Sequence, residues 1–170
     1  MCSISFWFAV LLGVSFVICA DDTPKPYSTF YTRKDGTHVK HTIYQNEQIS
    51  WMKAQLQCAA IGAHLGTFES VSESAKVISG FKLLRCPLCD GVLWMGAQRI
   101  KNTKDYEWLF DNMGNVSVNG WQGGDPEGGA NYCMVVSLKT YKFADLTCVG
   151  KYSTYGESKR LRGYVCTQNV

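Results

Sequence analysis

The spacing of the apolar side chains predicts two helices in the first half of the chain. Between Ser50, a good N-cap, and Gly62, a natural stop, the apolar residues of 51–61 recur at helical spacing. Behind a capping box at 70–73, apolar residues recur every third position, which predicts a second helix that ends before Cys86. The sequence therefore predicts two helices, each with a recognisable start and end.

Short strands and a long loop are predicted for the rest of the chain. The stretch 111–131 is rich in Gly, Asn and Asp, and long ordered loops commonly carry function. Two helices combined with short strands and a long loop indicate an α+β domain. Apolar or alternating runs that are expected to form strands occupy 39–44, 92–95, 107–110, 132–138 and 163–166.

The N-terminus has the pattern of a secretory signal peptide. Residues 1–20 contain no Asp, Glu, Lys or Arg, are apolar from Ile4 to Ile18, and end in the small residue Ala20. An uncleaved membrane anchor is the alternative interpretation of the same segment. We therefore expect a signal peptide over 1–20, an extended lead-in over 21–29, and a secreted, extracellular protein with no membrane span once the signal is removed.

The composition restricts the class of partner. A formal net charge of +3, from 17 basic and 14 acidic residues, is too small to indicate binding to nucleic acid. About 150 residues remain after the predicted signal, which is the size of one ordinary domain. We therefore expect a single folded domain rather than a disordered, collagen-like or coiled-coil chain.

Six cysteines remain outside the predicted signal, and an even number in an exported domain indicates disulfides. Their spacing alone does not select among the 15 possible pairings. The Cys86-Pro-Leu-Cys89 segment lacks a second pair of ligands at a distance suitable for zinc, so a local disulfide is the favoured interpretation.

Several motifs agree in order and spacing with one known family. They are Trp51-xx-Ala54-xxx-Cys58, Gly62-Ala63-His64-Leu65, Trp94-Met95-Gly96, Trp121-xx-Gly124-x-Pro126, Cys133, Asp145-xx-Cys148 and Cys166. Together they resemble the C-type lectin-like domain in its short form, covering residues 30–168. The resemblance implies a fold of two helices with small antiparallel sheets, a long loop region, and disulfides that join Cys58 to Cys166 and Cys133 to Cys148. Cys86 and Cys89 are then left for each other.

The resemblance also implies a candidate calcium site in the long loop. Its residues match the family's ligand positions at Asp125, Glu127, Asn131 and Asp145, on either side of a proline, Pro126, expected to follow a cis bond. Ala144 stands where the family supplies an asparagine oxygen, so one calcium ligand is missing. Ca2+ is therefore the expected cofactor only if the remaining oxygens suffice.

Sugar binding in the family uses the same loop, and here Asp125, Glu127 and Asn131 are the candidate ligand-binding residues. Asp125-Pro-Glu127 matches neither the mannose nor the galactose pattern of the family, and ionised carboxylates only accept hydrogen bonds. The alternative is that these acids and the neighbouring glycines form a solvated turn.

The first hypothesis is a secreted carbohydrate-recognition module, with or without the assistance of calcium, that binds a glycan or glycoprotein in surface recognition or innate immunity. The second is a calcium-independent module on the same fold that binds an extracellular protein. No catalytic constellation is recognisable, so an enzyme is not expected. Asn115-Val-Ser117 is an expected N-glycosylation site, and a basic insertion within 149–162 has no assigned role.

Overall fold

The computed structural model describes residues 24–149 and 160–170. The predicted signal peptide over 1–20 and most of the basic insertion lie outside the described residues. In order, the elements are β1 (Tyr27–Thr32), β2 (His38–Gln45), α1 (Trp51–Ala59), β3 (His64–Leu65), α2 (Val71–Arg85), β4 (Val92–Arg99), β5 (Tyr106–Trp108), the 3-10 helix η1 (Val118–Gly120), β6 (Cys133–Ser137), β7 (Phe143–Leu146) and β8 (Leu161–Asn169).

Both predicted helices form, and both begin at the predicted caps. The Ser50 hydroxyl accepts a hydrogen bond from the Lys53 amide, and the Ser70 hydroxyl accepts one from the Glu73 amide. The second half of the capping box differs from the expectation, because the Glu73 carboxylate accepts from the Glu69 amide rather than from Ser70. The carboxylate is drawn inward, where it forms ion pairs described below.

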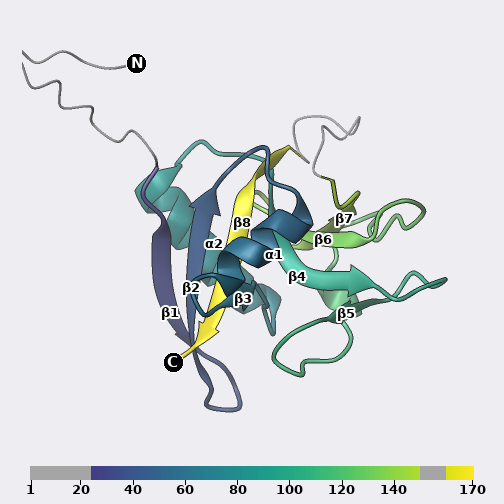
Figure 1. Ribbon diagram of the computed structural model, residues 1–170, viewed down its shortest axis with the longest axis horizontal. Helices are drawn as coiled ribbons and strands as arrows, with labels where there is room; N and C mark the ends of the chain where they lie inside the picture. Colours follow the sequence, from purple (N-terminus) through teal and green to yellow (C-terminus); the bar gives the residue numbers. More distant parts are fainter. Residues whose placement is uncertain (1–23, 150–159) are drawn as a thin grey trace, which may run out of the picture.

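The strands are more extensive and more connected than the sequence indicated. They form one eight-stranded sheet with a main path β1-β2-β8-β4-β6-β7, while β3 pairs with β8 and β5 with β4 (Figure 1). Small antiparallel sheets were expected, but β8 pairs in parallel with β4 and so joins the two halves of the sheet. β1 begins at Tyr27, inside the predicted lead-in, and β3 and β7 were not predicted as strands.

Each helix covers one face of the central strand β4, whose side chains alternate between two buried clusters. Trp94 packs with Trp51 and Ala54 of α1, whereas Leu93 and Met95 pack in the cluster that includes α2. Figure 1 shows α1 in front of the sheet and α2 behind it. Both faces of β4 are therefore inside the core, which explains why its apolar run does not alternate with polar residues.

Three disulfides join the pairs that the resemblance implied: Cys58 with Cys166, Cys133 with Cys148, and Cys86 with Cys89. The first ties α1 to β8 across a sequence separation of 108 residues, and chain entropy gives it about 4.7 kcal/mol of stabilisation. The second closes a separation of 15 residues at the base of the long loop, for about 3 kcal/mol.

Candidate functional site

The long loop is fastened to the sheet by one carboxylate, that of Asp145 on β7. Its side chain is fully buried. Oδ1 accepts a hydrogen bond from the Glu127 amide at 3.0 Å, and Oδ2 accepts one from the Gly128 amide at 2.8 Å. The Tyr106 hydroxyl lies 2.9 Å from Oδ2 as a third donor. We call this arrangement of the Asp145 carboxylate and its three donors the Asp145 cage.

The hydroxyl of Tyr106 is a buried donor that faces two acceptors. It lies 2.9 Å from the Asn131 carbonyl and 2.9 Å from the Asp145 carboxylate, so its one proton serves both. Burial raises the pKa of Tyr106 far above its usual range, and the negative charge of Asp145 raises it further. The phenol therefore stays protonated and holds the loop backbone at Asn131 against β7.

The expected metal ligands occupy different environments. The bond between Asp125 and Pro126 is cis, as expected, and Asp125 Oδ2 accepts a hydrogen bond from the Gln122 amide group at 2.9 Å. Glu127 is exposed, and its backbone rather than its carboxylate contacts Asp145. Asn131 is only 4% exposed. The loop therefore brings the predicted residues into one region, with Asp145 and Asn131 beneath its surface.

The donor set does not fit the calcium site that the resemblance implied. Ala144 is fully buried in the core cluster beside Cys133 and Val135 and has no side-chain oxygen to offer. The Asp145 carboxylate, which would be the strongest remaining ligand, already accepts three hydrogen bonds from protein groups. Over the described ranges 24–149 and 160–170, no three His, Cys, Asp or Glu side chains are grouped so as to hold a metal ion.

Two residues beside the loop were not singled out from the sequence. Tyr106 follows a polar turn, and only the pairing of β5 with β4 brings its hydroxyl to Asp145. Arg99, opposite Tyr106 in that pairing, places its guanidinium 4.0 Å from the centre of the Tyr132 ring. No local sequence pattern connects either residue to the loop, because both contacts arise from the register of the sheet.

Trp121 packs inside the loop. Its ring centre lies 4.8 Å from that of Tyr106 and 6.2 Å from that of Phe143. Its ring is therefore a support for the loop beside Tyr106. Asn115, the expected glycosylation site, is exposed and forms an isolated bridge with Glu107 on β5.

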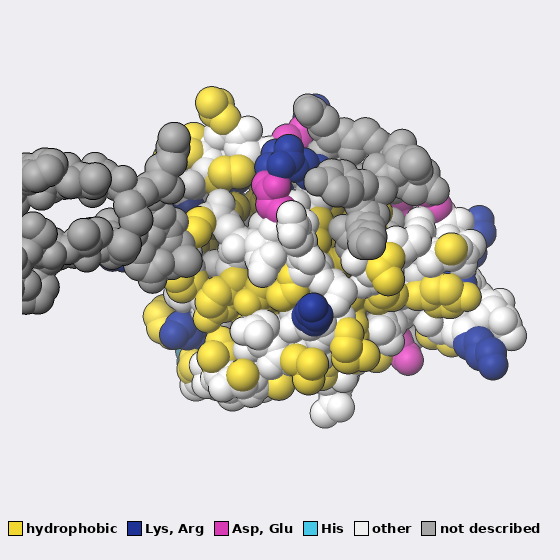
Figure 2. Space-filling model, turned by 45° about the horizontal axis from the view of Figure 1, so that its top comes forward, with side chains coloured by type: hydrophobic (Ala, Val, Ile, Leu, Met, Phe, Trp, Pro, Cys, Tyr) yellow, Lys and Arg dark blue, Asp and Glu magenta, His cyan; other side chains and the backbone are white. Residues whose placement is uncertain are grey.

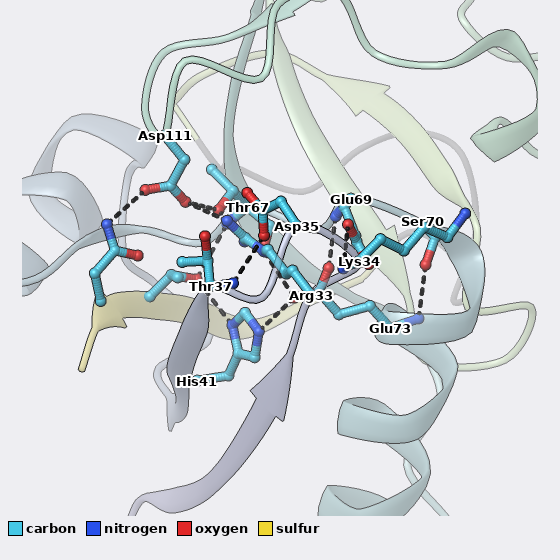
Figure 3. Close-up of polar contacts among 12 residues, drawn as sticks. Arg33, Lys34, Asp35, Thr37, His41, Thr67, Glu69, Ser70, Glu73 and Asp111 are labelled. Atoms are coloured by element: carbon cyan, nitrogen blue, oxygen red, sulfur yellow. Dashed lines mark hydrogen bonds and ion pairs between the residues drawn. The ribbon is translucent and has the colours of Figure 1, made fainter.

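A second buried carboxylate, that of Glu73 at the start of α2, lies in a separate polar cluster (Figure 3). It is fully buried and accepts from His41 Nε2 at 2.8 Å and from Arg33 Nε at 3.3 Å. Arg33 also donates to Asp111 at 2.9 Å and to the hydroxyl of Thr67 at 2.8 Å. The Glu73 cluster thus joins the β1–β2 turn, β2, α2 and the start of the long loop.

Three hydrogen bonds set the charge of Asp111. Burial by itself would raise the pKa of this carboxyl, but donors from His64, Thr67 and Arg33 hold the pKa well below its usual range. Asp111 is therefore ionised throughout the neutral range. The contact of His64 Nε2 with Asp111 at 2.9 Å gives this histidine a structural role.

Comparison with known proteins identifies the family but not the ligand. The lectin C-type domain model matches residues 47–155. A snaclec anticoagulant protein from Deinagkistrodon acutus is 26% identical, and the match covers 85% of this chain and 88% of that protein. C-type lectin domain family 4 member A from Rattus norvegicus is 24% identical over 82% of this chain. The chain spans only about half of that rat protein, because the match covers 55% of it.

The fold is also that of solved carbohydrate-recognition domains. The mouse scavenger receptor C-type lectin domain superposes with a TM-score of 0.57 at 16% identity, covering 82% of this chain and 95% of that one. At such a low sequence identity, the superposition shows that the two proteins share a fold and does not show that they share a ligand. Among the described residues, no helix is both long and apolar enough to cross a membrane. The family model matches most of the folded domain, and the fold agrees with that of a solved member. The chain therefore belongs to the C-type lectin domain family.

Proposed function

We propose that this protein is a binding module that recognises a protein ligand without calcium. Two hypotheses followed from the sequence, carbohydrate recognition and protein recognition. The contacts inside the long loop favour the second. The observation that carries the proposal is the Asp145 cage, in which protein donors occupy the carboxylate that a calcium ion would need.

The cage supplies the loop with the support that a metal ion would otherwise provide. Two backbone amides and a phenol are directed at one buried carboxylate, and such charge-assisted hydrogen bonds are about twice as strong as neutral ones. Calcium would have to displace these donors and leave them unsatisfied in a buried position, which costs about 1–3 kcal/mol for each group. The loop is therefore held in place by the chain's own groups.

A guanidinium beside the loop adds an electrostatic reason. A β-carbon placed on Gly128 would lie 3.3 Å from Arg99 Nη1, so this cation lies directly against the residue whose amide binds Asp145. A divalent metal bound beside this residue would be repelled by the guanidinium.

The exposed surface also suits a protein ligand. On the face shown in Figure 2, hydrophobic side chains form a broad band that contains a basic side chain, and a group of basic and acidic side chains lies above it. Met52 and Leu56 on α1 are 59% and 61% exposed. Exposed apolar side chains with few charges among them are characteristic of the centre of protein interfaces.

Secretion and glycosylation complete the proposal. The signal-like segment over 1–20 and three disulfides support an extracellular location, since disulfides persist in oxidising compartments. The exposed Asn115 in its sequon supports N-glycosylation there.

The test is a paired binding screen. The secreted protein would be applied to a glycan array and to a panel of extracellular proteins, each in excess calcium and in excess chelator. We expect binding to one or a few proteins that is equal in both conditions, and no glycan signal. Glycan binding that requires calcium and is lost in Asp125→Ala would contradict the proposal and restore the carbohydrate hypothesis.

A further inference from the structure

Arg99 and Tyr132 form a stacked pair at the edge of the long loop, in which the tyrosine ring is exposed and the arginine is half-buried. The Arg99 amide donates to the Tyr132 carbonyl at 2.9 Å, which fixes the two backbones side by side. The guanidinium carbon lies 4.0 Å from the ring centre of Tyr132, a close cation–π contact. Tyr132 itself is 47% exposed, so the pair forms part of the protein surface.

The guanidinium of this pair has no acidic partner among the described residues. Within 24–149 and 160–170, no carboxylate lies within ion-pair distance of Arg99, and its buried Nε has no hydrogen-bond partner. Arg33, Arg160 and Arg162, by contrast, are all paired with carboxylates. A guanidinium has the geometry to bind a carboxylate through two parallel hydrogen bonds, and because Nε of Arg99 is buried, its two Nη groups are the donors left for such a contact.

A lysine lies close to the same glycine. A β-carbon on Gly128 would be 3.3 Å from Arg99 Nη1 and 3.7 Å from Lys104 Cγ, so both basic side chains lie against a residue that carries no side chain of its own. Lys101, in the same β4–β5 turn, is exposed. The turn and the loop therefore present positive charge beside an exposed aromatic ring.

From these contacts we infer that Arg99, stacked on Tyr132 and assisted by Lys104, receives an Asp or Glu carboxylate of the protein ligand. This inference rests on the proposed function and names the chemistry of its partner. Arg and Tyr are the residue types that most often dominate binding energy at protein interfaces. Stacking pre-organises the guanidinium, which reduces the entropy lost when a carboxylate binds.

A protein carboxylate fits this surface better than a sulfated glycan does. Sulfated chains need an extended basic surface, whereas here Asp105 and Glu107 are exposed in the same hairpin and reduce the local positive potential. One guanidinium beside one tyrosine ring matches a ligand that presents a single carboxylate next to an apolar group. A sulfated saccharide is therefore the competing ligand that the test must separate.

The experiment is a titration of the secreted, isotope-labelled protein followed by NMR at the Arg99 Nε–Hε and Tyr132 amide signals. The probes are a hexaglutamate peptide, a hexalysine peptide of the same length, and a heparin-derived sulfated hexasaccharide. We expect saturable shifts of both signals with hexaglutamate and none with hexalysine. In Arg99→Lys, which keeps the charge but loses the two Nη donors, the affinity for hexaglutamate should fall about tenfold.

Arg85→Ala is the matched control, because Arg85 is an exposed arginine on α2 that lies away from the long loop. The affinity of this variant for hexaglutamate should equal that of the wild type. Tyr132→Leu keeps both cations and should weaken binding about threefold through the lost stacking. Arg99 signals that do not move with hexaglutamate, or that move only with the sulfated saccharide, would overturn the inference. If extracellular proteins bind without calcium but the Arg99 signals do not shift, only this inference fails and the proposed function stands.

Discussion

In the part of the chain that the structure describes, two carboxylates are fully buried, and they are satisfied in different ways. Glu73 at the start of α2 is held by charged or chargeable partners, Arg33 and His41, within a network that reaches four segments of the chain. Asp145 on β7 is held by neutral partners, two loop amides and the Tyr106 phenol. One carboxylate joins parts of the scaffold, and the other fastens a loop.

The difference separates what holds the fold from what shapes the candidate binding surface. In the Glu73 cluster, the guanidinium of Arg33 donates hydrogen bonds to Glu73, Asp111 and Thr67 (Figure 3). Around Asp145 the nearby guanidinium of Arg99 takes no part in the cage and is stacked on an exposed tyrosine instead. The guanidinium of Arg33 is therefore part of the scaffold, whereas that of Arg99 remains available for the ligand contact inferred above.

The largest expected effect is that of Glu73→Gln. The substitution leaves Arg33 with one carboxylate partner fewer and places an amide among buried donors, so unfolding free energy should fall by about 3–5 kcal/mol. Denaturant unfolding measures the change. Glu69→Gln is the control, since Glu69 is half-buried and accepts only from the Lys34 amide at 3.3 Å; its loss should stay below about 1 kcal/mol. Equal losses in the two variants would show that the Glu73 cluster contributes nothing particular.

Asp145→Asn should have a smaller and more local effect. The side chain keeps its shape but turns one acceptor into a donor that faces Gly128 or Glu127, at a cost of about 2–3 kcal/mol. Hydrogen exchange should accelerate at the amides of Glu127 and Gly128 more than in α2. Exchange that rises evenly over the whole chain would mean that the cage supports the fold rather than the loop.

The Asp111 carboxyl should make the Glu73 cluster sensitive to acid. Its pKa is lower in the folded protein than in the unfolded chain, so its stabilisation is present above about pH 4 and is lost as pH falls through the folded value. Urea unfolding at about pH 7 and about pH 3 should show a smaller acid-induced loss in Asp111→Asn than in the wild type. Identical losses in both proteins would assign the acid sensitivity to other carboxyls.

The smallest effect is expected at Asn115. Asn115→Gln removes the sequon from an exposed position, so the mass should fall by one glycan while unfolding free energy changes by less than about 0.5 kcal/mol. Mass spectrometry of the secreted protein measures the first and a thermal melt the second. An unchanged mass would show that the site is not used.

The sequence predicted those parts of the fold whose signals are local. Ser50 and Ser70 cap helices through residues only three positions away, so both helices were predicted with their starts. β1 was missed because its polar and aromatic alternation resembles an extended tail, and it is a strand only because β2 pairs with it. β7 lacks a signal of its own and depends on β6 in the same way.

The candidate site remains a prediction, although the structure brings two of its residues together. Asp125 and Asp145 do meet at the loop, where the Asp145 amide lies 3.5 Å from Asp125 Oδ1. The sequence could not show that Tyr106 reaches Asp145 from β5 or that Arg99 stacks on Tyr132, since both contacts depend on strand register. The resemblance to the family therefore suggested calcium, while the hydrogen-bond partners of Asp145 point to a loop held by the protein itself.

The most direct test of this account is a thermal melt of the secreted protein in excess calcium and in excess chelator. Because the Asp145 cage already satisfies the carboxylate, the two melting temperatures should agree within about 1 °C. A ligand at 100 times its dissociation constant stabilises by about 2.7 kcal/mol, which raises Tm by several degrees in a domain of this size. A calcium-dependent rise of that size, lost in Asp145→Asn, would contradict the account and return calcium to the loop.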